Sequence, residues 1–245
     1  MQLVPFAMTT FGLHTSVPIL RDAKLAALPA GHPHREEGAR RLLNVAVATI
    51  GIVLTAPVML LIAVAIKLSS PGPVFYRQRR VGLCVRSTYG GNNRRKVDLG
   101  GRPFTMFKFR TMRSAKPGEE IQVWASQDDP RITPVGRFLR RTRLDELPQL
   151  FNVLLGDMNI VGPRPEQPEI FQNLRDEVAS YSYRQQVRPG ITGRAQITLQ
   201  YDTCLDDVRK KVEADLEYIR TQSALEDLRI MLLTAPVMIF RKGSR

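Results

Sequence analysis

The feature that most constrains this chain is an uncharged apolar run from Leu42 to Ile66. As a helix the run would be about 37 Å long, whereas the hydrocarbon core of a bilayer is only ~30 Å thick. A helix this long that is apolar on every side is not expected inside a soluble domain of this size. The run therefore predicts a helix inserted into a membrane.

Pro57 lies within this run and predicts a kink, because proline removes one backbone hydrogen bond and clashes with the preceding turn. Basic residues flank the run on both sides, within 35–41 and 67–80. A spanning helix normally carries its Lys and Arg excess on one side only. The residues alone leave two topologies open: a kinked span, or a re-entrant helix that bends at Ala56–Pro57 and returns.

The charge balance indicates an anionic partner. Lys and Arg number 36 against 23 Asp and Glu, which gives a formal net charge of +13. Nucleic acid, an acidic membrane surface and phosphorylated small molecules all fit such an excess. Aromatic residues make up only 7% of the chain and show no RNA-binding alternation, which disfavours nucleic acid. The two cysteines form no framework of bridges, which is typical of a reducing, cytosol-facing location.

The strongest candidate site lies between Arg137 and Pro165, where the acidic pair Asp145 and Glu146 follows a cluster of arginines. An ionised Asp can attack phosphorus, an adjacent carboxylate can hold Mg²⁺, and guanidinium groups can neutralise phosphate oxygens. A helix N-terminus and the arginines would both lower the pKa of each carboxyl group. The same pair would also serve as an ordinary helix cap.

Three other cations are candidates for phosphate binding. Lys108 and Arg110 alternate with apolar residues in a predicted strand from Phe104 to Arg113, whose polar face is either solvated or a floor for phosphate. Arg164 stands between two prolines. This stiff backbone suits either a rigid connection or a guanidinium pre-set for phosphate.

Helical periodicity and capping residues predict the remaining elements. A helix should begin at Thr133–Pro134, and a second should start at Asp145 and end at Gly156. Further amphipathic helices are predicted over 171–187, 205–223 and 225–240. The last is too short to span a membrane and ends in basic residues, so it suits an interfacial position.

Three motifs, in order, resemble the bacterial sugar transferases: KFRTM from Lys108, DDPRITPVGRFLRRTRLDELPQLFNVLLGDMNIVGPRP from Asp128 to Pro165, and VRPGITGRAQI from Val187. The resemblance runs from about Arg40 to the end of the chain. It is to the small monotopic phosphoglycosyl transferases, also called undecaprenyl-phosphate hexose-1-phosphate transferases. The apolar run with Pro57 resembles that family's re-entrant membrane helix, which favours re-entry over a span.

The resemblance implies an enzyme at the cytosolic face of the bacterial inner (cytoplasmic) membrane. It would transfer a hexose 1-phosphate from a UDP-sugar to a polyprenyl phosphate such as undecaprenyl phosphate, release UMP, and so start exopolysaccharide, lipopolysaccharide or other glycoconjugate synthesis. Asp145 would be the nucleophile that carries the phosphosugar, and Glu146 would aid Mg²⁺ binding, with Asp145 close enough to share the ion. The cationic contacts to phosphate would be Lys108, Arg164, Arg188 and, as a weaker match, Arg110.

The predicted fold is mainly α with a small β element. It comprises a loosely ordered extension over 1–40, a re-entrant membrane helix over 41–68, and a cytosol-facing catalytic domain over 69–245 with amphipathic interfacial helices. The resemblance is to the small subgroup, which is limited to the catalytic domain. Two features depart from the family: Ala56 stands where some members have Ser, and the segment 86–101 is longer than the usual link.

The expected partners are the UDP-sugar, the polyprenyl phosphate and anionic lipids of the inner leaflet, and not nucleic acid; a homodimer is left open. No residue indicates which sugar is transferred. The main alternative is a non-catalytic, membrane-anchored basic protein that binds nucleic acid or anionic lipid. A metal-dependent phosphohydrolase that uses the same acidic pair is a third hypothesis.

Overall fold

The computed structural model describes residues 34–84, 101–113, 129–178, 180–199 and 204–239, which belong to one compact unit. Most of the predicted N-terminal extension and nearly all of the 86–101 segment lie outside these ranges. The described part is mainly helical with a small β component, as predicted.

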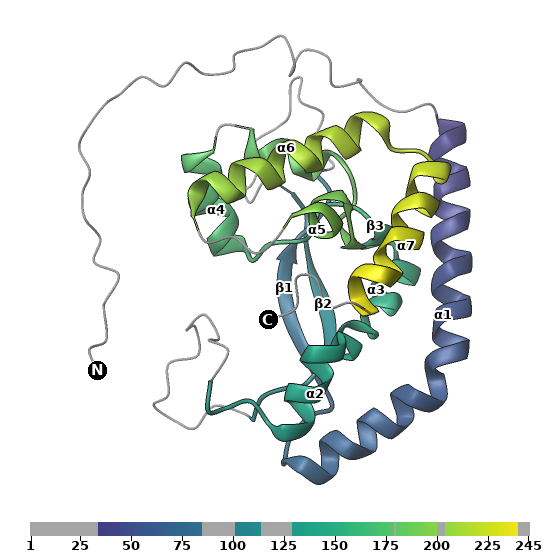
Figure 1. Cartoon of the computed structure of the whole chain (residues 1–245), viewed down its shortest axis with the longest axis vertical. Helices are drawn as coiled ribbons and strands as arrows, with labels where there is room; N and C mark the ends of the chain where they lie inside the picture. The colour runs from purple at the N-terminus through teal and green to yellow at the C-terminus, as the bar shows by residue number, and fades with distance from the viewer. Residues whose placement is uncertain (1–33, 85–100, 114–128, 179, 200–203, 240–245) are drawn as a thin grey trace, which may run out of the picture. The chain divides into compact units, whose positions relative to one another are not determined.

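The longest element is helix α1, His34–Ser69, which contains Pro57 and is visibly bent (Figure 1). It begins earlier than the predicted membrane segment, so the end of the predicted extension is helical. Within Glu37–Ser69 the helix is long and apolar enough to cross a membrane, and only 17% of an apolar 18-residue window within it is buried. The core helix of a soluble protein would be mostly buried, so this exposure supports membrane insertion.

Both ends of α1 pack against the same unit. Near its start, Arg40 and Asn44 are buried against helices α6 (Leu205–Thr221) and α7 (Ala224–Ile239) and strand β3 (Asn159–Val161). Near its end, it shares an apolar cluster with the rest of the unit, formed by Met59, Ile62, Ile66, Phe109 and Leu139.

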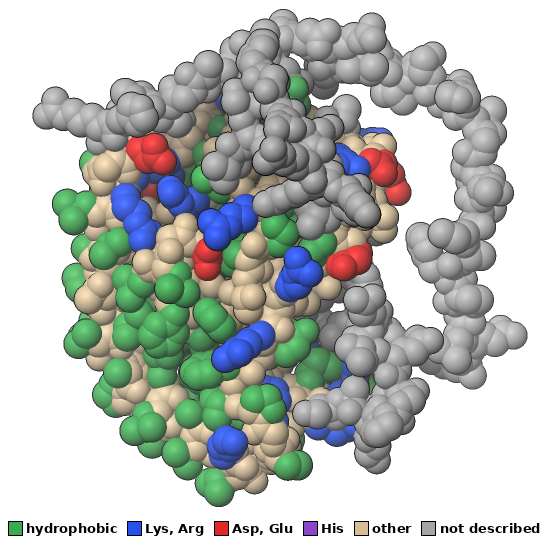
Figure 2. All heavy atoms as spheres, turned by 180° about the vertical axis from the view of Figure 1, so that it is seen from behind, with side chains coloured by type: hydrophobic (Ala, Val, Ile, Leu, Met, Phe, Trp, Pro, Cys, Tyr) green, Lys and Arg blue, Asp and Glu red, His purple; other side chains and the backbone are tan. Residues whose placement is uncertain are grey.

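The outer side of α1 is exposed and apolar. Its large exposed side chains are Leu42, Ile50, Val53, Leu54, Val58, Leu60, Leu61, Val64 and Leu68. Figure 2, which views the unit from behind, shows hydrophobic side chains gathered at the lower left, the side on which α1 lies. An uncharged surface of this extent is typical of a protein that contacts lipid or another apolar partner.

The β component consists of two small sheets. Strands β1 (Phe75–Val81) and β2 (Pro103–Phe109) are antiparallel, with Phe75 opposite Phe109 and Val81 opposite Pro103. Strand β2 confirms the predicted strand, although it ends before Arg110. The short strands β3 and β4 (Gly190–Thr192) are parallel. The loop that contains Arg164 follows β3 directly, and β4 comes later in the sequence.

Two of the predicted helix boundaries are confirmed, whereas the helix predicted to start at Asp145 starts at Gln149. Helix α2 (Pro134–Thr142) begins where the Thr133 hydroxyl accepts a hydrogen bond from the Gly136 amide at 2.9 Å. Helix α3 (Gln149–Leu155) ends at Gly156, whose φ of 85° lies in the left-handed region that favours glycine. Further helical elements are α4 (Pro168–Glu177), the 3₁₀ segment η2 (Tyr181–Gln186) and α5 (Arg194–Thr198).

The prediction of one helix over 171–187 is wrong. Helix α4 stops before Val178, which has an extended backbone, and the chain resumes as η2. The break lets Tyr181 pack on Phe171, with ring centroids 5.5 Å apart, and turns Arg184 inward to Asp215. These tertiary contacts outweigh the amphipathic pattern that the segment shows in the sequence.

Candidate functional site

The acidic pair lies in a tight connection between α2 and α3. The residue after α2, Arg143, has a left-handed backbone with φ 56° and ψ 15°. This conformation costs a non-glycine residue roughly 1–2 kcal/mol. The Arg143 carbonyl then accepts a hydrogen bond from the Glu146 amide at 3.1 Å, which closes the 3₁₀ turn η1, Leu144–Glu146. The pair is thus presented on a turn that reverses the chain.

The interpretation of the pair as a helix cap is wrong. Pro148, rather than either acidic residue, directly precedes α3. The Glu146 side chain is buried, and its Oε1 accepts hydrogen bonds from Lys108 Nζ at 3.1 Å and from Arg164 Nη2 at 2.8 Å. The Glu146 carboxylate therefore binds two cationic side chains, whereas the carboxylate of a helix cap would bind backbone amides.

Lys108 reaches the pair from β2, and α3 holds that strand in place. The fully buried Asn152 of α3 accepts a hydrogen bond from the Phe107 amide at 3.0 Å and donates one to the Thr105 carbonyl at 2.7 Å. These two bonds hold the strand at Thr105 and at Phe107, and Phe107 directly precedes Lys108. The sequence pattern did not mark Asn152, because a polar residue on a helix is usually exposed.

Arg164 reaches the pair from the loop after β3. Its Nη1 donates to Gln196 Oε1 at 3.3 Å, so Glu146 and Gln196 together orient the guanidinium. Its carbonyl accepts a hydrogen bond from Arg184 Nη2 at 3.1 Å, and Arg184 is itself paired with the buried Asp215 at 2.7 Å. The side chain of Arg164 remains 39% exposed, which leaves it accessible to a ligand.

The loop that carries Arg164 depends on a close approach of β3 and β4. The Gly162 amide donates to the Thr192 carbonyl at 2.9 Å, and the Gly190 amide donates to the Pro163 carbonyl at 3.0 Å. A Cβ atom on Gly190 would lie only 2.1 Å from the amide nitrogen of Gly162. Glycine is therefore required here by the distance between the two backbones.

Arg80 of β1 is a further cation at this site. Its Nη1 donates to the Pro165 carbonyl at 3.1 Å and lies 3.6 Å from Glu166 Oε2. Burial lowers the pKa of Arg80, and the nearby positive charge of Arg164 lowers it further. In the sequence Arg80 is one of several flanking basic residues, and only its tertiary contact with the loop after β3 sets it apart.

Burial separates the pKa values of the two acidic side chains. It raises the pKa of the half-buried Asp145 from 3.8 to about 6; Lys108 opposes this rise and the charge of Glu146 adds to it. Burial would also raise the pKa of Glu146, but Arg164 and Lys108 outweigh it and hold that pKa well below its usual range. The nearby cations lower both pKa values, as predicted, but only at Glu146 do they outweigh burial; the prediction of a lowered pKa is wrong for Asp145. Near neutral pH, both carboxyl groups are mainly ionised.

The structure does not bring the other two predicted cations to Glu146. Arg188 Nε donates to the Gly156 carbonyl at 3.1 Å, and its Nη1 lies 3.5 Å from Glu37 Oε1. Gly156 is at the far end of α3 from the acidic pair, and a helix of this length rises about 10 Å. Arg110 turns to the chain after α1, where it donates to the Pro71 and Ser70 carbonyls and to the Ser70 hydroxyl at 2.6–2.9 Å.

The acidic pair fits a divalent cation that is shared with a substrate. Within the described ranges, no group of three or more His, Cys, Asp or Glu side chains could hold a metal ion. Mg²⁺, however, is commonly bound through one or two carboxylates, with waters and substrate phosphates as its other ligands. Asp145 and Glu146 match that smaller requirement.

The sequence model of the family described as "Bacterial sugar transferase" matches residues 35–241. The chain is 44% identical over 239 residues to the UDP-glucose:undecaprenyl-phosphate glucose-1-phosphate transferase of Escherichia coli (strain K12), which covers 95% of this chain and 47% of that protein. It is 41% identical over 202 residues to the enzyme of the same name from Caulobacter vibrioides, covering 82% of this chain and 69% of that protein.

A third relative carries a different sugar in its name. The chain is 41% identical over 207 residues to the UDP-N-acetylgalactosamine-undecaprenyl-phosphate N-acetylgalactosaminephosphotransferase of Aeromonas hydrophila, covering 84% of this chain and 45% of that protein. The chain thus spans about half the length of several relatives that it matches. Because the family match extends over most of its residues, this chain belongs to the bacterial sugar transferase family.

Proposed function

We propose that this chain transfers a hexose 1-phosphate from a UDP-sugar to a polyprenyl phosphate through a covalent phosphosugar on Asp145, and releases UMP. The names of its relatives pair UDP-glucose or UDP-N-acetylgalactosamine with undecaprenyl phosphate. The observation that carries the proposal is the half-buried Asp145 beside a Glu146 that binds Lys108 and Arg164. This arrangement combines an ionisable nucleophile with cations for phosphate.

In the first step, a carboxylate oxygen of Asp145 attacks the phosphorus that bears the sugar. A new oxygen–phosphorus bond forms, and the phosphoanhydride bond to UMP breaks, so UMP leaves with the bonding electron pair. In the second step, an oxygen of the polyprenyl phosphate attacks the same phosphorus. The bond to Asp145 breaks, which regenerates the carboxylate and yields a polyprenyl diphosphate sugar.

Glu146 has a different role from Asp145. Its low pKa keeps it ionised throughout, so it holds Lys108 and Arg164 beside the nucleophile without competing for a proton. Arg164, which is partly exposed, would exchange part of its bonding to Glu146 for the donor phosphates. We propose Mg²⁺ as the cofactor, with Asp145 and Glu146 as its protein ligands, where it would neutralise charge on phosphate oxygens.

We further propose that α1 is re-entrant and that the site faces the cytosol at the inner membrane. Both ends of α1 contact the same unit, at Arg40 and at Ile66. A spanning helix would separate its ends by the ~30 Å of the hydrocarbon core and carry one end away from a domain on the other side. Anionic inner-leaflet lipids and a homodimer stay predictions.

The deciding experiment incubates the purified chain with UDP-glucose or UDP-N-acetylgalactosamine, with and without undecaprenyl phosphate. With the donor alone, intact-mass analysis should find one phosphosugar on the wild type and none on Asp145→Asn. Adding the lipid should discharge the adduct and produce repeated UMP release. If UMP forms with no adduct at any time, the covalent route is wrong. Release of free sugar phosphate instead of a lipid product would indicate a phosphohydrolase.

A further inference from the structure

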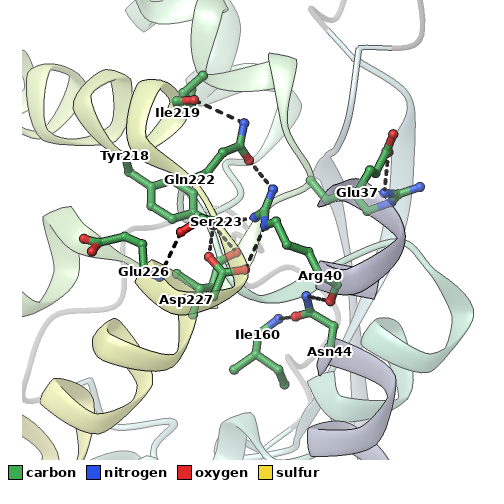
Figure 3. Close-up of polar contacts among 12 residues, drawn as sticks. Glu37, Arg40, Asn44, Ile160, Tyr218, Ile219, Gln222, Ser223, Glu226 and Asp227 are labelled. Atoms are coloured by element: carbon green, nitrogen blue, oxygen red, sulfur yellow. Dashed lines mark hydrogen bonds and ion pairs between the residues drawn. The ribbon is translucent and has the colours of Figure 1, made fainter. Parts of the chain in front are cut away.

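A buried set of polar side chains joins the start of α1 to α6 and α7 (Figure 3). We call it the α1 junction; its members are Arg40, Asn44, Tyr218, Gln222 and Asp227, all buried. Arg40 Nε lies 3.0 Å from Asp227 Oδ2, and Arg40 Nη2 donates to the Tyr218 hydroxyl at 2.7 Å. Arg40 Nη1 also donates to Gln222 Oε1. None of these groups has a part in the proposed chemistry.

The α1 junction also contacts β3. Asn44 Oδ1 accepts a hydrogen bond from the Ile160 amide at 2.5 Å, and Asn44 Nδ2 donates to the Arg40 carbonyl at 2.7 Å. The Tyr218 hydroxyl has two acceptors within reach, the Val161 carbonyl at 3.1 Å and Asp227 Oδ1 at 2.6 Å. Its single proton can donate fully to only one of them. Asn44 is therefore the firmer link between the membrane helix and the strand.

Asn44 takes the place of a second neighbouring strand. On one edge, β3 pairs with β4, where the Asn159 amide donates to the Pro189 carbonyl at 2.8 Å. The amide of the next residue, Ile160, points the opposite way, as alternation in a strand requires. That buried amide would be unsatisfied without the Asn44 side chain, which is itself fully buried.

The position of β3 determines the position of the Arg164 backbone. Only Val161, Gly162 and Pro163 separate Ile160 from Arg164. Gly162 is held by its bond to Thr192, and Pro163 has a fixed φ, so little freedom remains in between. A displacement of Ile160 would therefore be transmitted to the Arg164 guanidinium and its contact with Glu146.

We propose that Asn44 is a positioning residue that sets Arg164 through β3, so that the membrane helix helps to build the phosphate site. The inference rests on the proposed function, in which Arg164 binds the donor phosphates. Asn44 acts through the Ile160 amide and does not itself touch substrate. The α1 junction holds the first turns of α1 in the orientation that this contact requires.

The test compares three variants of the full chain in nanodiscs. Asn44→Leu keeps the shape of the side chain and removes the acceptor, and we expect KM for the UDP-sugar to rise about tenfold. Asn44→Asp keeps an acceptor for the Ile160 amide and should restore KM to within about threefold of wild type. Thr49→Val, which removes a bond within the same helix to the Val45 carbonyl, should leave KM unchanged. Should Asn44→Leu fail to fold, Asn44→Ala replaces it.

Two further readouts separate positioning from a merely structural role. Hydrogen exchange of the 157–164 segment should speed up in Asn44→Leu and not in Thr49→Val. In an Arg164→Ala background, Asn44→Leu should lower kcat/KM by less than about twofold, because both changes act on one contact. Independent, multiplying effects would overturn the inference, as would unchanged exchange. The exchange result does not depend on activity, so failure of the proposed transferase reaction remains distinguishable.

Discussion

Cationic side chains from other segments lie near both ends of α3, but they bind different partners at the two ends. Before the helix, Lys108 and Arg164 bind the buried carboxylate of Glu146. After it, Arg41 donates to the Val153 and Leu154 carbonyls at 2.7 and 2.9 Å, and Arg188 donates to the Gly156 carbonyl. The second pair satisfies the open carbonyls and negative dipole end of a helix. The first pair binds a carboxylate, which a substrate phosphate can partly replace.

The difference teaches that the partner of a cation decides its function. A guanidinium that completes a helix terminus is committed to the fold, and its removal costs stability. A guanidinium held by a carboxylate beside a half-buried Asp145 is available to an incoming anion. Resemblance to the family placed Arg164 and Arg188 in one class, whereas the structure separates them.

The largest effect is expected for Asp145→Asn, which removes the feature that distinguishes the first end of α3. UMP release should fall by at least about 10³-fold, because no carboxylate remains to attack phosphorus. A variant that keeps more than a tenth of wild-type turnover would show that Asp145 is not the nucleophile. Asp145→Glu is the control, because it keeps the carboxylate charge but changes the length of the side chain.

The same variant should be more stable at neutral pH. The folded pKa of Asp145, about 6, lies above its ordinary value of 3.8, so the wild type loses stability as pH rises from about 4 to 6. Asp145→Asn lacks that loss, and its free energy of unfolding at pH 7.5 should be higher by on the order of 1–3 kcal/mol. The gain should vanish near pH 4. Denaturant titrations at the two pH values measure it, and an equal gain at both would contradict the assigned pKa.

Next in size is the contrast between Arg164→Ala and Arg188→Ala. The first should lower kcat/KM for the UDP-sugar by about 100-fold, because a phosphate contact is lost. The second should stay within about threefold of wild type and lower the free energy of unfolding by about 1 kcal/mol, because a helix carbonyl loses its donor. Kinetics and denaturation on both variants decide the matter. Equal losses of activity in the two variants would show that Arg188 contributes to phosphate binding as Arg164 does, and would contradict the distinction between them.

A smaller effect should appear in the pH dependence. With donor alone, the rate of phosphosugar formation should fall about tenfold per pH unit below about 6, since Asp145 must be ionised to attack. Raising Mg²⁺ should move the midpoint to lower pH if the ion binds the pair, because a cation favours the ionised form. A midpoint pH that does not change with Mg²⁺ concentration would argue against Asp145 and Glu146 as ligands of the ion.

The smallest effect concerns Arg143, whose left-handed backbone presents the acidic pair. Arg143→Gly and Arg143→Ala both remove the side chain, but only glycine adopts this backbone without strain. The glycine variant should be more stable than the alanine variant by about 1–2 kcal/mol. Thermal unfolding compares the two, and equal stabilities would indicate that the turn relaxes.

Local rules account for the parts of the fold that were predicted correctly. The apolar run with Pro57 produces the bent α1, alternation produces β2, and Thr133 and Gly156 bound α2 and α3. Each of these signals acts within a few residues, through backbone hydrogen bonds, side-chain direction or allowed φ values. The motif that contains Asp145 and Glu146 was likewise recognisable from the sequence.

Contacts between distant residues decided the rest. Asn44, Arg80 and Asn152 joined the site or its support because other elements pack against them, and no local pattern distinguishes them from ordinary polar residues. Burial raised the pKa of Asp145 against its neighbouring cations. The sequence by itself determined most of the helices and strands and the residue types at the candidate site, since both depend on local geometry and residue type. Only the tertiary structure decided which cations meet the acidic pair, because burial and long-range distance arise from packing.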